Sequence, residues 1–294
     1  MGLRYTRITA IFSCALASTT PALAQQRTSA PPAQRILSIG GDITEVLYEL
    51  GASDRVVAVD TSSQFPPDAL KLKKNVGYIR ALSPEGVLSV APDLVIASDR
   101  AGPPEIVRTL KSAVTYVEVP ESQGVAAKIR AIGVAIGDKI GGDRLAARVT
   151  NELAVLEVDR KRIEKPLRAL FVLSVQSGRA TVGGSGTSAD AILKLSGLDN
   201  AASDIAGFKP VSDEALHAMQ PDVVVTMRRS TGGGHDSDQV LELAGLSRSP
   251  ARENRRVIET DGRYLLGFGP RVASAARDLM LAAYPGLVTA TQAR

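Results

Sequence analysis

Tyr78 and Arg80 stand two positions apart in GYIRALSPEG and are the residues of this sequence best suited to hold a metal. A positive charge near a phenol favours its ionised form, because it stabilises the negative oxygen. A phenolate is a hard oxygen ligand that suits ferric iron, and tyrosine ligates haem iron in some proteins. The alternative is a half-buried packing role for Tyr78. We favour the ligand because the segment is a loop entering a helix, where α/β folds place ligand contacts.

The segment around Tyr78 is partly repeated in the second half of the chain. GYIRALSPEGVLSVAPDLVIAS begins at Gly77, and GFKPVSDEALHAMQPDVVVTM begins at Gly207. Both copies predict a short amphipathic helix, a Pro-Asp turn and a β-branched strand. The tyrosine–arginine pair occurs only in the first copy, since the second has Phe208-Lys209-Pro210 in its place. The sequence therefore predicts one scaffold used twice and a strong ligand supplied once.

Glu85 and Glu214 occupy matching positions in the two copies. Each falls in the first turn of its predicted helix, where the helix dipole favours a carboxylate, and this alone explains each of them. As a pair on two similar lobes they would also present two like charges to a partner with two basic patches.

The elements that must position these residues follow an alternating pattern. Residues 36–59 predict a strand, a Gly-Gly turn, a helix ending at Gly51 and a second strand, which is the order of a parallel βαβ unit. Residues 144–165 contain no Gly or Pro and predict a long stiff helix, after which a strand restarts at Ala169–Val175. We therefore predict an α/β protein with two Rossmann-like lobes, each with a parallel sheet, joined by one long rigid helix, with a ligand cleft between the lobes. The expected boundaries are a signal peptide over 1–24, a flexible leader over 25–34, a first lobe over 35–141, the connecting helix over 142–165 and a second lobe over 166–294.

The N-terminus has the pattern of a secretory signal, with a basic start, an apolar run and the small-x-small site Ala22-Leu23-Ala24. The apolar run is shorter than the roughly 20 residues that a membrane anchor needs. Lipid attachment at Cys14, the only cysteine, is the other alternative, but the bulky Phe12 argues against it. The mature chain would then lack disulfides. It would carry 33 basic and 31 acidic residues, which does not indicate a nucleic-acid partner.

The sequence offers little that indicates catalysis. The only histidines are His217 and His235, and GxSxG, HExxH and P-loop patterns are absent. The glycine-rich GGSGTSA stretch at 183–189 is better interpreted as turn chemistry than as a phosphate loop. His235, in GGGHDSD, is a candidate ligand contact, the alternative being plain solvent exposure. We therefore expect a binding protein and not an enzyme.

The chain resembles the periplasmic haem-binding proteins of bacterial ABC transporters, which belong to the substrate-binding proteins for haem, siderophores and cobalamin. The resemblance covers residues 35 to 286, and its most specific part is GYIRALSPEG. It implies that Tyr78 binds the iron of haem b axially, with Arg80 supporting the phenolate. It also implies that Glu85 and Glu214 dock onto arginines of an inner-membrane permease, which works with its ATPase, and that an outer-membrane haem receptor system acts upstream. The other segments that carry the resemblance are GGDITEVLYELGASDRVVAVD, GGSGTSADAILKLSGLDNA, DEALHAMQPDVVV and LLGFGPR.

The sequence departs from the family pattern in the second lobe. Some members supply a histidine after the strand that matches ALFVLSV, whereas this chain has SVQSGRATVGG with Gln176. Five-coordinate iron on Tyr78 is therefore expected. Gln176 and His235 are candidate cleft contacts, and Arg228 and Arg229 are either propionate contacts or a solvated strand end. The alternatives are a ferric siderophore or cobalamin as ligand, or a periplasmic haem chaperone or enzyme that has no transporter.

Overall fold

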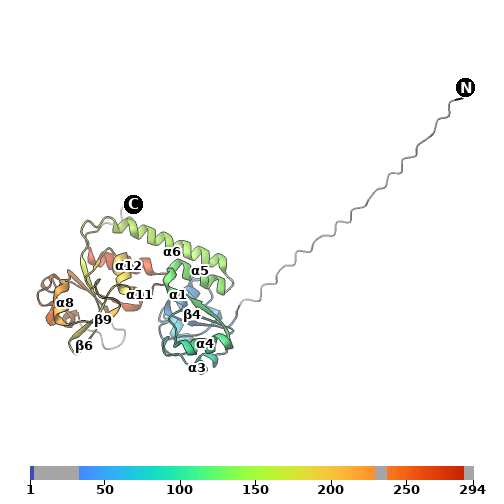
Figure 1. Ribbon diagram of the computed structural model, residues 1–294, viewed down its shortest axis with the longest axis horizontal. Coiled ribbons are helices and arrows are strands. Elements are labelled where there is room, and N and C mark those ends of the chain that lie inside the picture. The colour runs from blue at the N-terminus through green and yellow to red at the C-terminus, as the bar shows by residue number, and fades with distance from the viewer. Residues whose placement is uncertain (3–32, 229–236, 288–294) are drawn as a thin grey trace. The chain divides into compact units, whose positions relative to one another are not determined.

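The computed structural model of the protein describes residues 1–2, 33–228 and 237–287. The predicted signal peptide, most of the leader, Arg229 and His235 lie outside these residues. All the helices and strands below belong to the part of the chain that begins at Pro32 (Figure 1). Within the described residues, none of the helices combines the length and the apolarity needed to cross a membrane.

The first sheet is wholly parallel, as predicted. Its order is β3-β2-β1-β4-β5, so the chain steps outward from β1 in both directions and the strand order reverses between β1 and β4. The apolar runs predicted at 36–39 and 56–59 are strands with the same bounds. The strands are β1 (Ile36–Ile39), β2 (Val56–Val59), β3 (Lys74–Asn75), β4 (Leu94–Ser98) and β5 (Thr115–Val119).

Helices cover both faces of the first sheet because alternate side chains of its strands point to opposite faces. Ile36 and Ile96 belong to a buried cluster with residues of α1 and α5, whereas Leu37 and Val95 belong to a cluster with residues of α3 and α4. The helices of this lobe are α1 (Gly41–Glu49), α2 (Asp68–Leu72), α3 (Pro84–Leu88), α4 (Pro104–Ala113) and α5 (Val125–Ala135), with 3₁₀ turns at Ser53–Arg55 and Glu121–Gln123.

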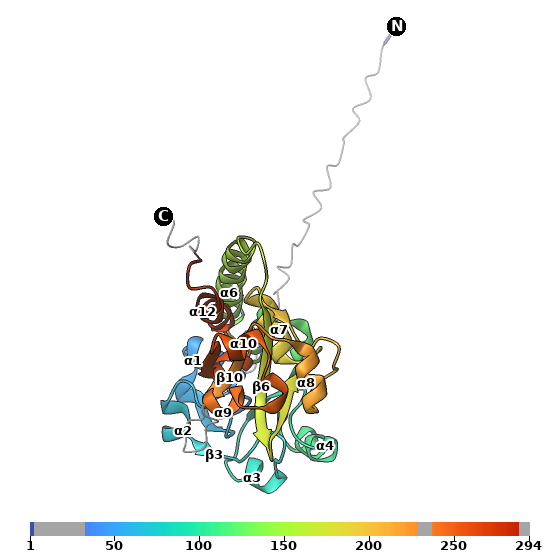
Figure 2. The same cartoon turned by 90° about the vertical axis from the view of Figure 1, so that its left-hand side faces the viewer.

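One long helix, α6 (Lys139–Arg160), lies between the two sheets in the sequence. It begins three residues before the predicted start at 142, and Asp138 caps it by accepting a 2.9 Å hydrogen bond from the Gly141 amide. The glycines of this first turn permit a close crossing with α5, since a Cβ on Gly133 would lie 2.8 Å from the Gly142 Cα. Farther along, α6 packs against α12 and α7, and α12 lies beside it in both views (Figures 1 and 2).

The second sheet is mixed, which corrects the prediction of a parallel sheet in this lobe. β6, β10 and β11 are parallel, but β7 pairs antiparallel with both β6 and β9. The cause is a two-residue hairpin at Ser177-Gly178, where φ is 51° and 75°. Positive φ at both central residues is the type I′ turn that joins adjacent antiparallel strands. The strands are β6 (Arg168–Gln176), β7 (Arg179–Gly183), β8 (Asp199–Asn200), β9 (Phe208–Pro210), β10 (Val223–Arg228) and β11 (Val257–Asp261).

The second sheet is also covered on both faces. Ala169 and Phe171 face the cluster that contains residues of α7, α11 and α12, and Leu170 and Val172 face the cluster with residues of α8, α9 and α10. The helices are α7 (Ser188–Leu195), α8 (Asp213–Met219), α9 (Ser237–Leu241), α10 (Pro250–Glu253), α11 (Gly262–Leu266) and α12 (Val272–Ala283), with a 3₁₀ turn at Ala244–Leu246. Gly184 to Thr187 form the turn between β7 and α7, within the stretch that the sequence indicated as turn chemistry.

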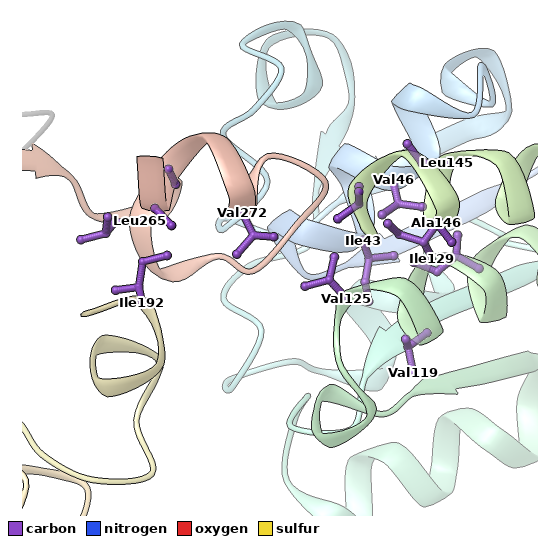
Figure 3. Close-up of a cluster of buried hydrophobic side chains, with 14 of the residues drawn as sticks. Ile43, Val46, Val119, Val125, Ile129, Leu145, Ala146, Ile192, Leu265 and Val272 are labelled. Atoms are coloured by element: carbon purple, nitrogen blue, oxygen red, sulfur yellow. The ribbon is translucent and has the colours of Figure 1, made fainter. Parts of the chain in front are cut away.

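The two sheets share one apolar core. A single buried cluster joins Ile43 of α1, Ile129 of α5 and Leu145 of α6 to Ile192 of α7 and Val272 of α12. Figure 3 shows the side chains of α1, α5 and α6 together, with Val272 between them and Leu265. This continuity argues that the lobes move little against each other, because separating them would expose apolar surface.

The sequence repeat is a repeat of structure. Ser83 caps α3 and Ser212 caps α8, each by accepting a bond from an amide three residues on. The carboxylate of Asp93 accepts from the Arg35 amide before β1, and that of Asp222 accepts from the Arg168 amide at the start of β6. The prediction that both copies form a short helix, a Pro-Asp turn and a strand is confirmed.

Candidate ligand-binding site

Tyr78 lies at the carboxyl edge of the first sheet, three residues after β3. Gly77 precedes it with φ of 98°, a left-handed conformation that favours glycine. The Gly77 carbonyl accepts a 2.9 Å bond from the Thr61 amide, and its amide donates to the Asn75 side chain at 2.8 Å. The loop after β2 therefore holds the backbone that carries Tyr78. Ligands of parallel α/β sheets bind at this edge.

The turn that contains Tyr78 is anchored by the residue between the two candidates. Ile79 packs against the apolar cluster under α3 and α4, and its carbonyl accepts a 2.7 Å bond from the Gly102 amide. The Tyr78 carbonyl accepts from the Ala81 amide at 2.8 Å, which closes the turn. Tyr78 is 50% exposed and Arg80 is exposed. Within the described residues Arg80 forms no ion pair, so its support of the phenolate stays a prediction.

The other four tyrosines of the described residues are unsuited to act as anionic ligands. Burial raises the pKa of Tyr48, Tyr116 and Tyr284. The pKa of Tyr264 is raised by burial and by the hydrogen bond that its hydroxyl donates to Asp278. A raised pKa keeps a phenol protonated at neutral pH. Among the described tyrosines, Tyr78 is thus the one with a half-exposed ring at the carboxyl edge of a sheet.

One of these buried phenols gives a test of the electrostatics. Burial raises the pKa of Tyr116 from 10.0 to about 12, and its hydroxyl has no hydrogen-bond partner among the described residues. The folded state then keeps a proton that the unfolded state releases, so stability falls as pH rises from 10 toward 12. We expect Tyr116→Phe to be neutral or slightly stabilising at pH 7 and to remove about 1 kcal/mol of the loss at pH 11. Urea unfolding at pH 7 and pH 11 measures both; an unchanged alkaline loss would contradict the assignment.

Asp60 holds together two loops at this edge, a role that was not predicted from the sequence. It is fully buried at the end of β2. Its carboxylate accepts from the Gly40 and Ser62 amides at 2.9 Å and from the Ser62 and Ser63 hydroxyls at 2.9 and 3.1 Å. These bonds tie the turn after β1 to the loop after β2. The available signal was an aspartate followed by Thr-Ser-Ser directly after an apolar strand.

The second-lobe candidates fall at the corresponding edge. Arg228 ends β10, is exposed and is the register partner of Asp261. Gln176 ends β6 next to the hairpin turn and is exposed. Arg229 and His235 lie outside the described residues, so their positions stay predictions. No group of three or more His, Cys, Asp or Glu residues within the described part could hold a metal ion.

A shallow surface hollow of about 490 Å³ lies elsewhere. It is lined by Arg162, Leu167 and Arg256, which precede β6 and β11, so it belongs to the amino edge of the second sheet. It is therefore not the cleft expected next to Tyr78 and Arg228.

Glu85 and Glu214 are both exposed in the first turns of matching helices, α3 and α8. The Ser212 side chain, by hydrogen bonding, holds the pKa of Glu214 below its ordinary value, so this carboxylate stays charged at neutral pH. Both side chains are therefore exposed, and their docking onto a partner stays a prediction.

Two α/β lobes on one shared core, with candidate ligand residues at the carboxyl edges, define a two-lobe binding protein. The Periplasmic binding protein family matches residues 36–264, and the chain belongs to this family.

Solved structures support the same class. The chain is 38% identical to the periplasmic heme-binding protein RhuT from Roseiflexus sp. RS-1, with a TM-score of 0.80 over 87% of this chain and 100% of that one. It is 36% identical to the periplasmic heme-binding protein BhuT in complex with two hemes, with a TM-score of 0.80 over 86% and 99%.

Two relatives found by sequence also match most of the chain. An uncharacterized ABC transporter substrate-binding lipoprotein of Bacillus subtilis is 29% identical over 86% of this chain and 80% of its own length. A vitamin B12-binding protein of Vibrio parahaemolyticus is 26% identical over 83% and 87%.

Proposed function

We propose that this protein captures ferric haem in the periplasm and delivers it to an inner-membrane ABC permease for haem and iron uptake. The observation that carries the proposal is Tyr78, a half-exposed tyrosine at the carboxyl edge, in a molecule whose other described tyrosines are kept protonated by their surroundings. The similar structures named as heme-binding proteins support the choice of ligand. Residues 1–24 would direct secretion and be removed. The mass of the exported protein tests this, because it should lack these residues.

Binding requires no chemical change of the ligand. Tyr78 would supply an axial phenolate oxygen to the iron, which is the strong and specific bond of the complex. Arg80 would stabilise the negative charge on that oxygen, as a nearby cation does for any phenolate. Arg228, at the matching edge of the second sheet, would bind a propionate through its planar guanidinium.

Cobalamin is the second candidate ligand, because relatives named vitamin B12-binding proteins match most of the chain. Cobalamin has no need of Tyr78 as a metal ligand, whereas haem does. Calorimetric titrations of the mature protein with hemin, cyanocobalamin and a ferric siderophore separate these possibilities. We expect saturable binding of hemin alone. Saturation by cyanocobalamin or the siderophore without hemin binding would overturn the proposal.

Delivery to a permease predicts a role for the two exposed glutamates. We expect Glu85→Gln with Glu214→Gln to leave hemin affinity unchanged and to lower hemin transport about tenfold or more, because charge pairs across an interface contribute several kcal/mol. Transport into proteoliposomes that contain the permease and ATPase is the measurement. Glu105→Gln, in the exposed first turn of α4, is the matched control. Unchanged transport by the double variant would show that these two carboxylates do not dock the permease, and absence of transport with the wild-type protein would favour a chaperone that has no transporter.

A further inference from the structure

Arg271, directly before α12, bridges the second lobe to the first. Its Nε donates to Glu45 Oε2 at 2.9 Å and its Nη2 donates to Glu45 Oε1 at 2.7 Å. Two parallel bonds between a guanidinium and a carboxylate fix direction as well as distance. The side chains are 28% and 12% exposed, so water screens the pair only partly.

The same guanidinium lies over two aromatic rings. Its carbon lies 3.5 Å from the centroid of Phe65 and 4.9 Å from that of Tyr264. Phe65 belongs to the loop after β2 in the first lobe, and Tyr264 belongs to α11 in the second. Cation–π contacts of a partly desolvated arginine add to the ion pair. Arg271 therefore holds both α1 and the loop after β2.

The loop after β2 is the one that holds Tyr78. Its Thr61 amide donates to the Gly77 carbonyl, next to Tyr78. At the start of the loop, buried Asp60 fixes Ser62 and Ser63, and Phe65 contacts Arg271 at its far end. The loop is thus tied at one end to the sheet and at the other to the second lobe.

We propose that Arg271 is a positioning residue. From the second lobe it fixes the loop after β2, and through that loop the backbone that carries Tyr78, without touching the ligand. The contacts run from Arg271 to the ring of Phe65, along the loop after β2 to Thr61, and from the Thr61 amide to the Gly77 carbonyl. The importance of this path for ligand binding rests on the proposed function, but the path itself can be measured in the ligand-free protein.

The first experiment is amide hydrogen exchange of Thr61 in the ligand-free protein. We expect Arg271→Met to speed the exchange about tenfold, because loss of contacts lowers the free energy of local opening. Arg256→Met is the matched control: Arg256 is also a partly buried arginine of the second lobe, but it donates to the Ala283 carbonyl of α12 at 2.7 Å, so its loss leaves no buried carboxylate unpaired. We expect Thr61 exchange in Arg256→Met to match wild type. Equal exchange rates in the two variants would overturn the proposal, whether or not hemin binds.

Two further variants keep the test decisive. Phe65→Leu removes the aromatic contact and leaves the ion pair, so it should also speed Thr61 exchange; if Arg271→Met does not fold, an unchanged rate in Phe65→Leu overturns the proposal. Arg271→Lys keeps the charge but loses the fork of two bonds, and should lie between wild type and Arg271→Met. With hemin, we expect Arg271→Met to bind about tenfold more weakly while retaining the tyrosinate spectrum, since Tyr78 itself is intact.

Discussion

Tyr78→Phe is expected to lower the affinity for hemin by about a hundredfold or more, a loss of roughly 3 kcal/mol. The substitution removes the oxygen that would bind iron and keeps the aromatic ring, so the packing of the turn around Ile79 is preserved. The anchoring bonds of this turn come from the backbone and do not depend on the phenol. Competition titration of the purified proteins measures the change.

Tyr116→Phe is the matched control, because it removes a phenol oxygen that is buried away from the carboxyl edge of the sheet. We expect it to bind hemin as wild type does. Equal hemin affinity in the Tyr78 variant and this control would show that another group binds the iron.

Lys128→Met is expected to lower the free energy of unfolding by about 3–5 kcal/mol, because it leaves a buried carboxylate without its cation. Lys128 of α5 donates to Asp42 of α1, and the side chains are 4% and 10% exposed. Asp42→Asn should have a large effect as well, since it leaves the ammonium buried. The double variant should be more stable than the sum of the two losses implies. Urea unfolding of the wild type, the two single variants and the double variant measures these losses. If the loss in the double variant equalled the sum of the two single losses, the pair would not be coupled.

The pH dependence of Lys128→Met has a definite sign. Burial raises the pKa of Asp42 above its ordinary 3.8, and Lys128 opposes that rise. Without Lys128 the folded carboxyl holds its proton still more strongly, so folding is favoured at low pH and the advantage is lost as pH rises through the folded pKa. The penalty should therefore be smallest near pH 4 and largest at neutral pH.

An exposed pair provides the control for this effect. Lys139 and Asp143 are also an ion pair, but their side chains are 73% and 43% exposed. We expect Lys139→Met to change stability by less than about 0.5 kcal/mol. A similar loss at both sites would mean that burial is not the cause.

The sequence was informative where the structure is local. Apolar runs with β-branched residues predicted β1, β2 and β4, because strands buried on both faces are continuously apolar. Tyr78 could be singled out because its loop enters a helix within a few residues and an arginine stands two positions away. The repeated Ser and Asp residues also act locally, as caps of neighbouring elements.

Other features carried no local signal. β3 and β9 have two and three exposed residues, so no apolar pattern marks them. The connecting helix was predicted to begin at Gly142, but α6 begins at Lys139, because close packing on α5 overrides the weak helix propensity of the glycines in its first turn. The hairpin at Ser177-Gly178 had a turn signature that was not recognised. Glu45 and Arg271 meet across 226 positions of sequence, a pairing that no spacing rule predicts.

The most direct test of iron binding by Tyr78 is the resonance Raman spectrum of the ferric hemin complex, prepared with ordinary and with ring-deuterated tyrosine. We predict phenolate ring modes that shift on deuteration in the wild-type complex and are absent from Tyr78→Phe. Absence of such modes from the wild-type complex, or their persistence in Tyr78→Phe, would contradict haem capture through this residue.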